Sequence, residues 1–209
     1  MQVVIVDTGY GNLRSVERAT QAAAREQSRA VEVTRSADAS AIQRADAVIF
    51  PGQGAFLDCR GALSRELSEA ILEKIRSGAP FLGICIGLQL LFEGSEEAPG
   101  CPGLGWFKGH VRRLDPAGVK IPHMGWNQLE LHNDGHRALS AAGGTGAWVY
   151  FVHSFHALPS EAGVLKATVS YGNNQITAAV ARDNVLATQF HPEKSQHVGL
   201  ALLKEFLRG

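Results

Sequence analysis

A cysteine, a histidine and a glutamate in this sequence have the types and spacing needed for acyl transfer. Cys85 lies in the stretch Gly83-Ile84-Cys85-Ile86-Gly87, which has the G-x-nucleophile-x-G spacing of a nucleophile elbow. In such an elbow the small neighbours permit a tight, strained turn that pushes the reactive atom out of the sheet. The alternative is a buried cysteine that behaves as a small hydrophobic residue. The flanking glycines favour the nucleophile.

A base and a group that orients it are the further requirements of a cysteine nucleophile. Among eight histidines, His191 is the best candidate, because it ends a strand-like run and Pro192 keeps the backbone extended. Residues two apart in extended backbone point the same way, so Glu193 would hold the His191 ring. The alternative, a solvated His-Pro-Glu turn, stays open at this point because a triad is defined by geometry and not by spacing.

The loop Pro51-Gly52-Gln53-Gly54 could supply the donors that an acyl-transfer site aims at a developing oxyanion. Its two glycines let bare backbone approach a substrate carbonyl. The backbone N–H of Ile86, just after the nucleophile, would be a second donor, as elbow geometry provides. An ordinary strand-to-helix turn is the alternative.

Other residues with possible chemistry are weaker candidates. His153 and His156 have H-x-x-H spacing, but no third ligand cluster accompanies them, so we expect no metal site. His132 and His136 bracket a turn at 133–135 and are expected to be solvated. The turn at 9–14 lacks the third glycine of a dinucleotide fingerprint, so we expect no cofactor there.

The elements that position these residues alternate through the first half of the chain. We expect strands at 2–7, 31–35, 47–50 and 81–85, with helices near 13–25, from about 58 to 76, and after Cys85, where Leu88, Leu91 and Phe92 have helical spacing. A helix start at Cys85 would also favour the thiolate through free N–H groups and the helix dipole. Such alternation predicts a parallel sheet with helices on both faces, whose carboxyl-end loops share one rim. That rim would bring together the turn at 9–12, the loop at 51–55 and Cys85.

The second half is richer in antiparallel β-structure. We expect strands at 110–114, 126–131, 148–153, 164–171, 175–180 and 185–190, with a turn at 172–174, and a closing helix at 196–207 that packs Leu203, Phe206 and Leu207 inward. The helix near 58 would be capped by Asp58, with Leu63, Leu67, Ile71 and Ile75 as its apolar stripe. With no repeat and no linker, residues 1–209 are expected to form a single α/β domain.

The composition of the chain indicates which classes of partner and which cellular compartment to expect. Lysine plus arginine equals aspartate plus glutamate, 20 against 20, so no global field would attract nucleic acid or an anionic membrane. Three cysteines without CxxC spacing argue against a disulfide framework and fit a reducing cytoplasm. The chain begins with a strand and has neither a signal-peptide pattern nor a membrane-spanning run, so we expect a soluble cytoplasmic protein.

The motifs around Gly52, Cys85 and His191-Pro192-Glu193 together resemble those of the class I (triad) glutamine amidotransferases. Further stretches at 7–12, 122–127, 150–155 and 189–195 resemble one group in this family, whose members supply ammonia to a separate cyclase subunit. The resemblance runs from end to end. It implies a flavodoxin-like parallel or mixed sheet flanked by helices.

The resemblance also implies roles for individual residues. Cys85 would attack the side-chain amide of glutamine, His191 would protonate departing ammonia and then activate water, and Glu193 would orient His191. Asn12, Trp126 and Lys194 would face the cyclase subunit in a heterodimer. The residues that would hold the substrate or the oxyanion are Gly52, Gln53, Gly54, Ile86, Gln89, Glu97, Ser154 and Phe155. At Gln53 and Phe155 the chain departs from the family pattern, which has a small aliphatic residue and often a tyrosine there.

Ammonia released into neutral water becomes a non-nucleophilic ion, and the chain has no Walker A sequence and no spare length for a synthase domain. The acceptor chemistry is therefore expected on another polypeptide. Two alternatives remain. One is a cysteine hydrolase that serves a different synthase or cleaves peptides, and the other is a non-catalytic binding or regulatory module.

Overall fold

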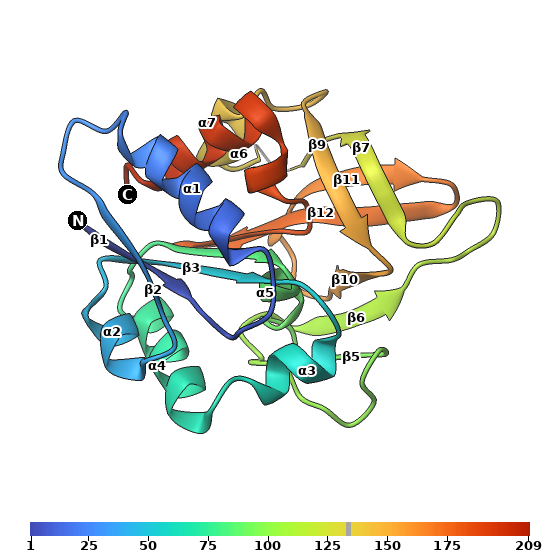
Figure 1. Ribbon diagram of the computed structural model, residues 1–209. Coiled ribbons are helices and arrows are strands. Elements are labelled where there is room, and N and C mark those ends of the chain that lie inside the picture. Colours follow the sequence, from blue (N-terminus) through green and yellow to red (C-terminus); the bar gives the residue numbers. More distant parts are fainter. Residues whose placement is uncertain (133–134) are drawn as a thin grey trace.

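The computed structural model describes residues 1–132 and 135–209 and is built on an eight-stranded mixed sheet (Figure 1). The turn expected at 133–135 lies partly outside the described residues. Five neighbouring strands pair in parallel and the last three are antiparallel, as the two halves of the sequence predict. In spatial order the strands are β2 (Glu32–Ser36), β1 (Gln2–Val6), β3 (Ala47–Gly52), β4 (Phe81–Cys85), β13 (Val185–Thr188), β12 (Asn174–Arg182), β11 (Leu165–Tyr171) and β8 (Glu130–Leu131).

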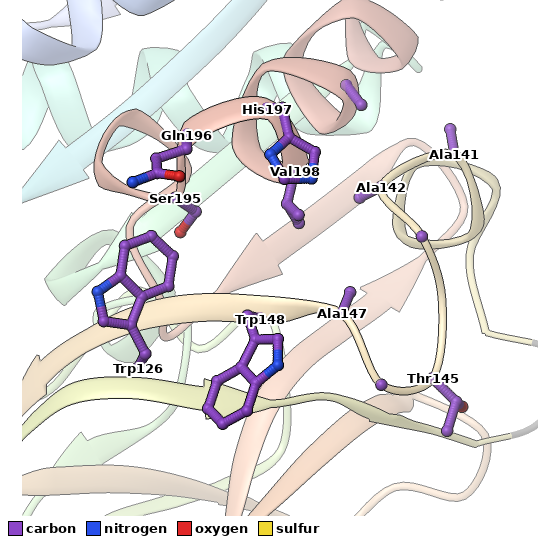
Figure 2. A pocket seen from close by; sticks show the side chains of 13 residues that line it. Trp126, Ala141, Ala142, Thr145, Ala147, Trp148, Ser195, Gln196, His197 and Val198 are labelled. Atoms are coloured by element: carbon purple, nitrogen blue, oxygen red, sulfur yellow. The ribbon is translucent and has the colours of Figure 1, made fainter.

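Two smaller sheets lie beside the antiparallel part of the large one. One contains β5 (Gly94–Ser95), β6 (Gly109–Arg113) and β10 (Phe155–Pro159), and the other is a ribbon of β7 (His123–Gln128) and β9 (Trp148–His153). Between this ribbon and the start of the last helix lies a cavity of about 670 Å³, with Trp126 and Trp148 in its wall (Figure 2). Both tryptophans are exposed to solvent, by 43% and 52%.

Helices cover both faces of the large sheet (Figure 1). One face carries α1 (Leu13–Ala24), α6 (Arg137–Ala141) and α7 (Gln196–Phe206), and the other carries α2 (Ala39–Arg44) and α4 (Arg65–Arg76). The short α3 (Phe56–Gly61), α5 (Ile86–Gln89) and the 3₁₀ turn η1 (Pro192–Lys194) lie in connections. In the part of the chain that the structure describes, no helix is both long and apolar enough to cross a bilayer.

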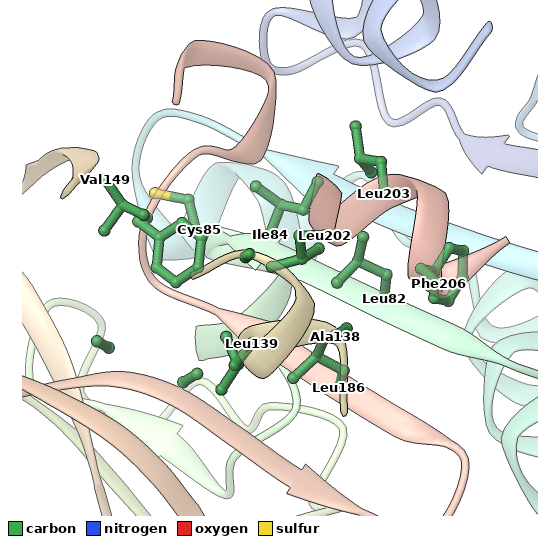
Figure 3. Packing of buried hydrophobic residues seen from close by; sticks show 14 of the residues in the cluster. Leu82, Ile84, Cys85, Ala138, Leu139, Val149, Leu186, Leu202, Leu203 and Phe206 are labelled. Atoms are coloured by element: carbon green, nitrogen blue, oxygen red, sulfur yellow. The ribbon is translucent and has the colours of Figure 1, made fainter. Parts of the chain in front are cut away.

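Strand alternation divides the apolar residues between two cores. In β1, Val3 and Ile5 face the core under α1 and α7, while Val4 and Val6 face the core over α2 and α4. This follows from the period of two along a strand that is buried on both faces. Figure 3 shows Leu82 and Ile84 of β4 packed with Leu202 of α7 in the first core. The central strands therefore hold the loops at their carboxyl ends on a rigid base.

Some predicted boundaries were wrong. The helix expected from Asp58 is two helices, because α3 ends at Gly61 and Ser64 starts α4 by accepting a hydrogen bond from the Leu67 N–H at 3.1 Å. The strand expected at 126–131 is divided between β7 and β8, and the strand expected to reach Phe190 ends at Thr188. The elements α2, α6, β5 and β10 were not predicted, since each is short. The inward packing of Leu203, Phe206 and Leu207 is confirmed by their burial.

Candidate active site

The elbow at Cys85 has the strained backbone that its sequence predicts. Cys85 ends β4 with φ +55° and ψ −106°, a region that residues other than glycine seldom occupy. A side chain at position 87 would place its Cβ 1.8 Å from the Phe50 carbonyl oxygen, and one at position 83 would lie 3.0 Å from the Gly87 carbonyl oxygen. Both glycines are therefore needed for close packing of the elbow against β3 and against itself. The helix that follows is one turn, shorter than the spacing of Leu88, Leu91 and Phe92 predicts.

The loop after β3 reaches the same rim as Cys85. Gly52 pairs with Cys85 in the parallel register of β3 and β4, and a Cβ on Gly52 would lie 3.0 Å from Ile86. The turn at 9–12 is adjacent, because a Cβ on Gly11 would lie 3.2 Å from the Gln53 nitrogen. The prediction that these three segments share one rim is confirmed.

The orientation of the Gln53 carbonyl is set by a second cysteine. The Cys59 thiol, buried in α3, donates to the Gln53 carbonyl oxygen at 3.5 Å. Burial raises the pKa of Cys59 to about 11, so this group stays a thiol and a donor at neutral pH. The Gln53 carbonyl is thus turned toward α3, and Gly54 continues the loop with φ +110°.

A cavity of about 400 Å³ opens over the elbow. Most of the predicted substrate residues line it, together with Pro122, Val152 and His153, to which the sequence analysis assigned no substrate contact. Gly52 does not line this cavity but supports it through Ile86. The predicted residues in its wall are Gln53, Gly54, Cys85, Ile86, Gln89, Glu97, Ser154, Phe155 and Lys194.

His191 and Glu193 form a buried pair. The His191 Nδ1 and a Glu193 carboxylate oxygen are 2.7 Å apart, and the two side chains are only 1% and 2% exposed. A carboxylate can only accept, so Nδ1 carries the proton of this hydrogen bond. Glu193 lies in the 3₁₀ turn η1 and not in extended backbone, so the expected pairing occurs with a different local structure. The solvated-turn alternative is wrong, since both groups are buried.

The other ring nitrogen of His191 is left available. Nε2 is buried and has no hydrogen-bond partner among the described residues. Burial alone would lower the pKa of His191, but the charge of the adjacent Cys85 thiolate and the bonded Glu193 carboxylate outweigh it and raise the pKa to about 10. The folded site therefore favours the protonated form of the His191 ring.

Gln89 presents an acceptor at the cavity. Its Nε2 donates to the Phe155 carbonyl oxygen at 3.0 Å and to the Gln189 Oε1 at 3.1 Å. Its own Oε1 is buried and has no partner within residues 1–132 and 135–209. An unpartnered buried acceptor costs folding free energy, which a donor on a bound substrate would recover.

Glu97 and the histidines near the cavity have structural partners. Glu97 lines the cavity and accepts the Phe56 N–H of α3 at 3.0 Å. His153 shares one hydrogen bond with His123 at 3.1 Å and donates another to the Phe155 carbonyl oxygen at 2.9 Å, while His156 accepts the Thr177 N–H at 3.3 Å. Across residues 1–132 and 135–209, no group of three or more His, Cys, Asp or Glu is arranged to hold a metal ion.

The residues expected to face a partner lie at or near the rim. Trp126 is half-exposed and meets the Tyr150 ring edge to face at 6.0 Å between centroids. The Lys194 ammonium lies 5.6 Å from the centre of the same ring, so Trp126 and Lys194 are neighbours around Tyr150. Asn12 is exposed and starts α1, with its side chain accepting the Ser15 N–H at 3.4 Å.

Gln189 is the residue that the sequence reasoning missed. It is fully buried and its Nε2 lies 3.5 Å from the Cys85 sulfur. The signal was present, because Gln189 precedes His191 by two positions just as Glu193 follows it by two.

The family model described as glutamine amidotransferase class-I matches this chain over residues 4–208. The chain therefore belongs to the class-I glutamine amidotransferases. Solved structures agree in fold: a structure described as a glutamine amidotransferase has a TM-score of 0.72 at 22% identity and covers 98% of this chain and 97% of its own. The structure of PurLQS from Thermotoga maritima has a TM-score of 0.73 at 18% identity, covering 99% and 97%.

Similar curated proteins indicate which group within this family the chain resembles. A protein of Rhodospirillum rubrum is 45% identical, with 100% of this chain and 99% of the relative covered. A protein of Geobacter metallireducens is 47% identical, with 98% and 96% covered. Both are named imidazole glycerol phosphate synthase subunit HisH, which is thus the particular group of class-I amidotransferases that this chain resembles over its whole length.

Proposed function

We propose that this protein is the glutaminase subunit of imidazole glycerol phosphate synthase. It hydrolyses glutamine to glutamate and ammonia, and it passes the ammonia to a cyclase subunit that forms imidazole glycerol phosphate and AICAR in histidine biosynthesis. The full-length likeness to HisH subunits supports this role. The observation that carries the chemistry is the buried His191–Glu193 pair, which leaves Nε2 of the ring available to the adjacent Cys85 side chain.

The first half of the reaction forms a thioester. The Cys85 sulfur attacks the side-chain carbonyl carbon of glutamine, and a tetrahedral oxyanion results. The N–H groups of Ile86 and of the Gly52–Gly54 loop are the proposed donors to that oxyanion. His191 gives its Nε2 proton to the amide nitrogen, the C–N bond breaks, and ammonia leaves.

The second half restores the enzyme. His191, now neutral, takes a proton from water as the water oxygen attacks the thioester carbon. The C–S bond breaks, glutamate forms, and the sulfur returns as the thiolate beside an imidazolium. Glu193 keeps the ring in the orientation that both proton transfers need. These steps use side chains and water.

The substrate is held by groups around the cavity. Gln89 Oε1 offers an acceptor, and Glu97 places a carboxylate in the wall. Ser154 and Phe155 also line the cavity, where we propose that they position the substrate chain. The Gln53 carbonyl is already bonded to the Cys59 thiol. The backbone group that we propose Gln53 contributes is therefore its N–H.

The acceptor of the ammonia lies on a partner, in our proposal a cyclase subunit in a heterodimer. Ammonia that escaped into water would be protonated, so direct transfer favours a partner over the cavity rim. Asn12, Trp126 and Lys194 are the proposed contacts, and Lys194 also lines the cavity. We further propose that residues 1–209 act as a single glutaminase domain, since the family model matches residues 4–208. The compartment that we propose is the cytoplasm, because Cys59, Cys85 and Cys101 are free thiols.

An ammonia-release assay tests the function. Purified protein is given glutamine, with and without the cyclase subunit encoded by the same organism, and we expect hydrolysis that the cyclase stimulates. An electrophilic glutamine analogue should label Cys85 in competition with glutamine but not with peptides. Well-folded protein that neither hydrolyses glutamine nor accepts the label would refute the proposal.

A further inference from the structure

The Cys85 sulfur has one neighbour whose role is not covered above. The Gln189 Nε2 lies 3.5 Å from Sγ, within the range of hydrogen bonds to sulfur, and Gln189 is fully buried. We propose that Gln189 is a further catalytic residue: its side-chain amide donates a hydrogen bond to the Cys85 thiolate and holds the sulfur in its attacking position. The inference rests on the proposed glutaminase function and deepens it.

The hydrogen-bond network decides which end of the Gln189 amide faces the sulfur. The Phe155 backbone carbonyl can only accept, so the Gln89 atom 3.0 Å from it is the amide nitrogen. The second hydrogen of that nitrogen goes to the Gln189 side chain at 3.1 Å, which must therefore present its oxygen there. The remaining end of the Gln189 amide, next to Cys85, is then the donor. A backbone carbonyl thus sets the polarity at the nucleophile through two side chains.

The backbone around Gln189 makes this contact rigid. The last parallel pair between β13 and β4 is Thr188 with Ile84, so the next residues, Gln189 and Cys85, lie side by side at the strand ends. The Gln189 N–H donates to the Ala178 carbonyl of β12 at 2.8 Å. His191 follows two positions later. One strand end therefore brings both the base and the amide donor to the sulfur.

The chemistry gives the donor two functions. When the Cys85 sulfur is ionised, the neutral amide donates to a charged acceptor, and such hydrogen bonds are stronger than those between two neutral groups. When the thioester breaks down, negative charge returns to sulfur and the same donor stabilises the leaving group. Because Gln189 also accepts from Gln89, its loss would disturb the acceptor that Gln89 presents to the substrate.

Alkylation of Cys85 by iodoacetamide tests the inference without requiring turnover. The rate is measured against pH, with the modified residue identified by peptide mass spectrometry, because Cys59 and Cys101 are also free thiols. In Gln189→Met, a variant of similar length without a donor, we expect the profile to move to higher pH by about one unit. Gln189→Glu keeps an acceptor for Gln89 but places a carboxylate beside the sulfur, so we expect a larger shift. The kcat for glutamine should fall about tenfold in Gln189→Met.

Thr188→Val is the matched control. It removes a buried hydrogen bond, from the Thr188 hydroxyl to the Phe190 carbonyl at 3.0 Å, from the same strand end without a contact to sulfur. Its alkylation profile should superimpose on that of the wild type. If Gln189→Met does not fold, Gln189→Glu decides the question, and a folded Gln189 variant with an unchanged profile would overturn the inference.

Failure of the inference and failure of the proposed function give different results. If the wild type hydrolyses glutamine and the Gln189 variants keep its alkylation profile, Gln189 has no role at the sulfur while the function stands. If the profile shifts as expected but the wild type releases no ammonia, the contact at sulfur stands and the function is lost.

Discussion

The cavity beside Trp126 and Trp148 and the cavity at Cys85 differ in what their walls contain. The cavity between Trp126, Trp148 and α7 has a volume of about 670 Å³, against about 400 Å³ at Cys85. Alanine, glycine and tryptophan form most of the larger wall. The smaller site has a thiol, a carboxylate and the unpartnered acceptor of Gln89, with the unpartnered His191 Nε2 beside it.

Cavity volume alone therefore does not identify a reactive site. Buried polar atoms without partners cost roughly 1–3 kcal/mol each, so their presence at the smaller cavity requires a compensating role in binding or catalysis. None of the buried side-chain atoms that lack a partner within the described residues belongs to the wall of the larger cavity. We therefore expect perturbations of the smaller cavity to change turnover and those of the larger one to leave it nearly unchanged.

Removal of the sulfur is the strongest test of this contrast. Cys85→Ala should lower glutaminase turnover by roughly 10⁴-fold or more, because members of a catalytic unit fail together. Cys101→Ala, a half-buried cysteine outside both cavities, is the control and should stay near the wild-type rate. Ammonia release measures both, and equal rates for Cys85→Ala and the wild type would exclude Cys85 as the nucleophile.

Glu193→Gln tests the buried pair behind the smaller cavity. The amide keeps the shape of the side chain but loses the charge that holds the His191 Nδ1 proton, so kcat should fall roughly 10²- to 10⁴-fold. Glu205, a largely buried ion-pair partner of the exposed Arg137 and Arg208 outside the cavity wall, offers the control Glu205→Gln with unchanged kcat. If Glu193→Gln instead raises KM and leaves kcat unchanged, the carboxylate acts in substrate binding.

The histidines around the smaller cavity predict a loss of stability in acid. Burial lowers the pKa of His153 to about 3 and those of His123 and His156 to about 4. Below the ordinary pKa of about 6.5 these histidines are protonated in the unfolded chain but stay neutral in the folded chain. The stability that the protein has above that pH is therefore lost as the pH falls toward 4. The unfolding free energy should drop by about 1.4 kcal/mol per pH unit for each such proton.

Denaturant titrations between pH 7 and pH 4.5 measure this dependence. His156→Gln, which keeps an acceptor for the Thr177 N–H, removes one titrating group and should reduce the slope by one proton. A slope that is the same in this variant and the wild type would contradict the prediction for His156.

Gln89→Met tests the acceptor in the cavity wall. The variant loses the Oε1 that we propose for the substrate and the donor to Gln189, so KM for glutamine should rise about tenfold, the value of one hydrogen bond with a desolvated partner. Steady-state kinetics separate this from a change in kcat. A change in kcat with KM unaltered would assign the residue to the transition state only.

Trp148→Ala should have the smallest effect. The side chain is half-exposed and belongs to the wall of the larger cavity, so glutamine hydrolysis by the isolated subunit should stay within about twofold of the wild type. The same ammonia assay measures it. A rate of ammonia release at least tenfold below that of the wild type would show that the larger cavity contributes to turnover. The expected difference between the two cavities would then be wrong.

Local sequence patterns predicted the parts of the molecule that depend on local backbone. The alternation of strand-like and helix-like segments predicted the parallel part of the large sheet. The glycines around Cys85 predicted an elbow, which the positive φ of Cys85 confirms. Element boundaries were less predictable, because the cap at Ser64 and the four-residue α5 depend on what each segment packs against. The 3₁₀ turn at Glu193 was likewise not visible in the spacing of His191 and Glu193.

The identity of the chemical groups and the backbone turn that presents Cys85 follow from residues close together in the chain, since glycine and proline restrict conformation within a few residues. Tertiary contacts, in contrast, bring Gln189 to that sulfur and join it through Gln89 to the Phe155 carbonyl, across separations of 104, 100 and 66 residues. The reason is that the pairing of β13 with β4 places distant strand ends side by side. Burial then selects the side chains that can satisfy one another there.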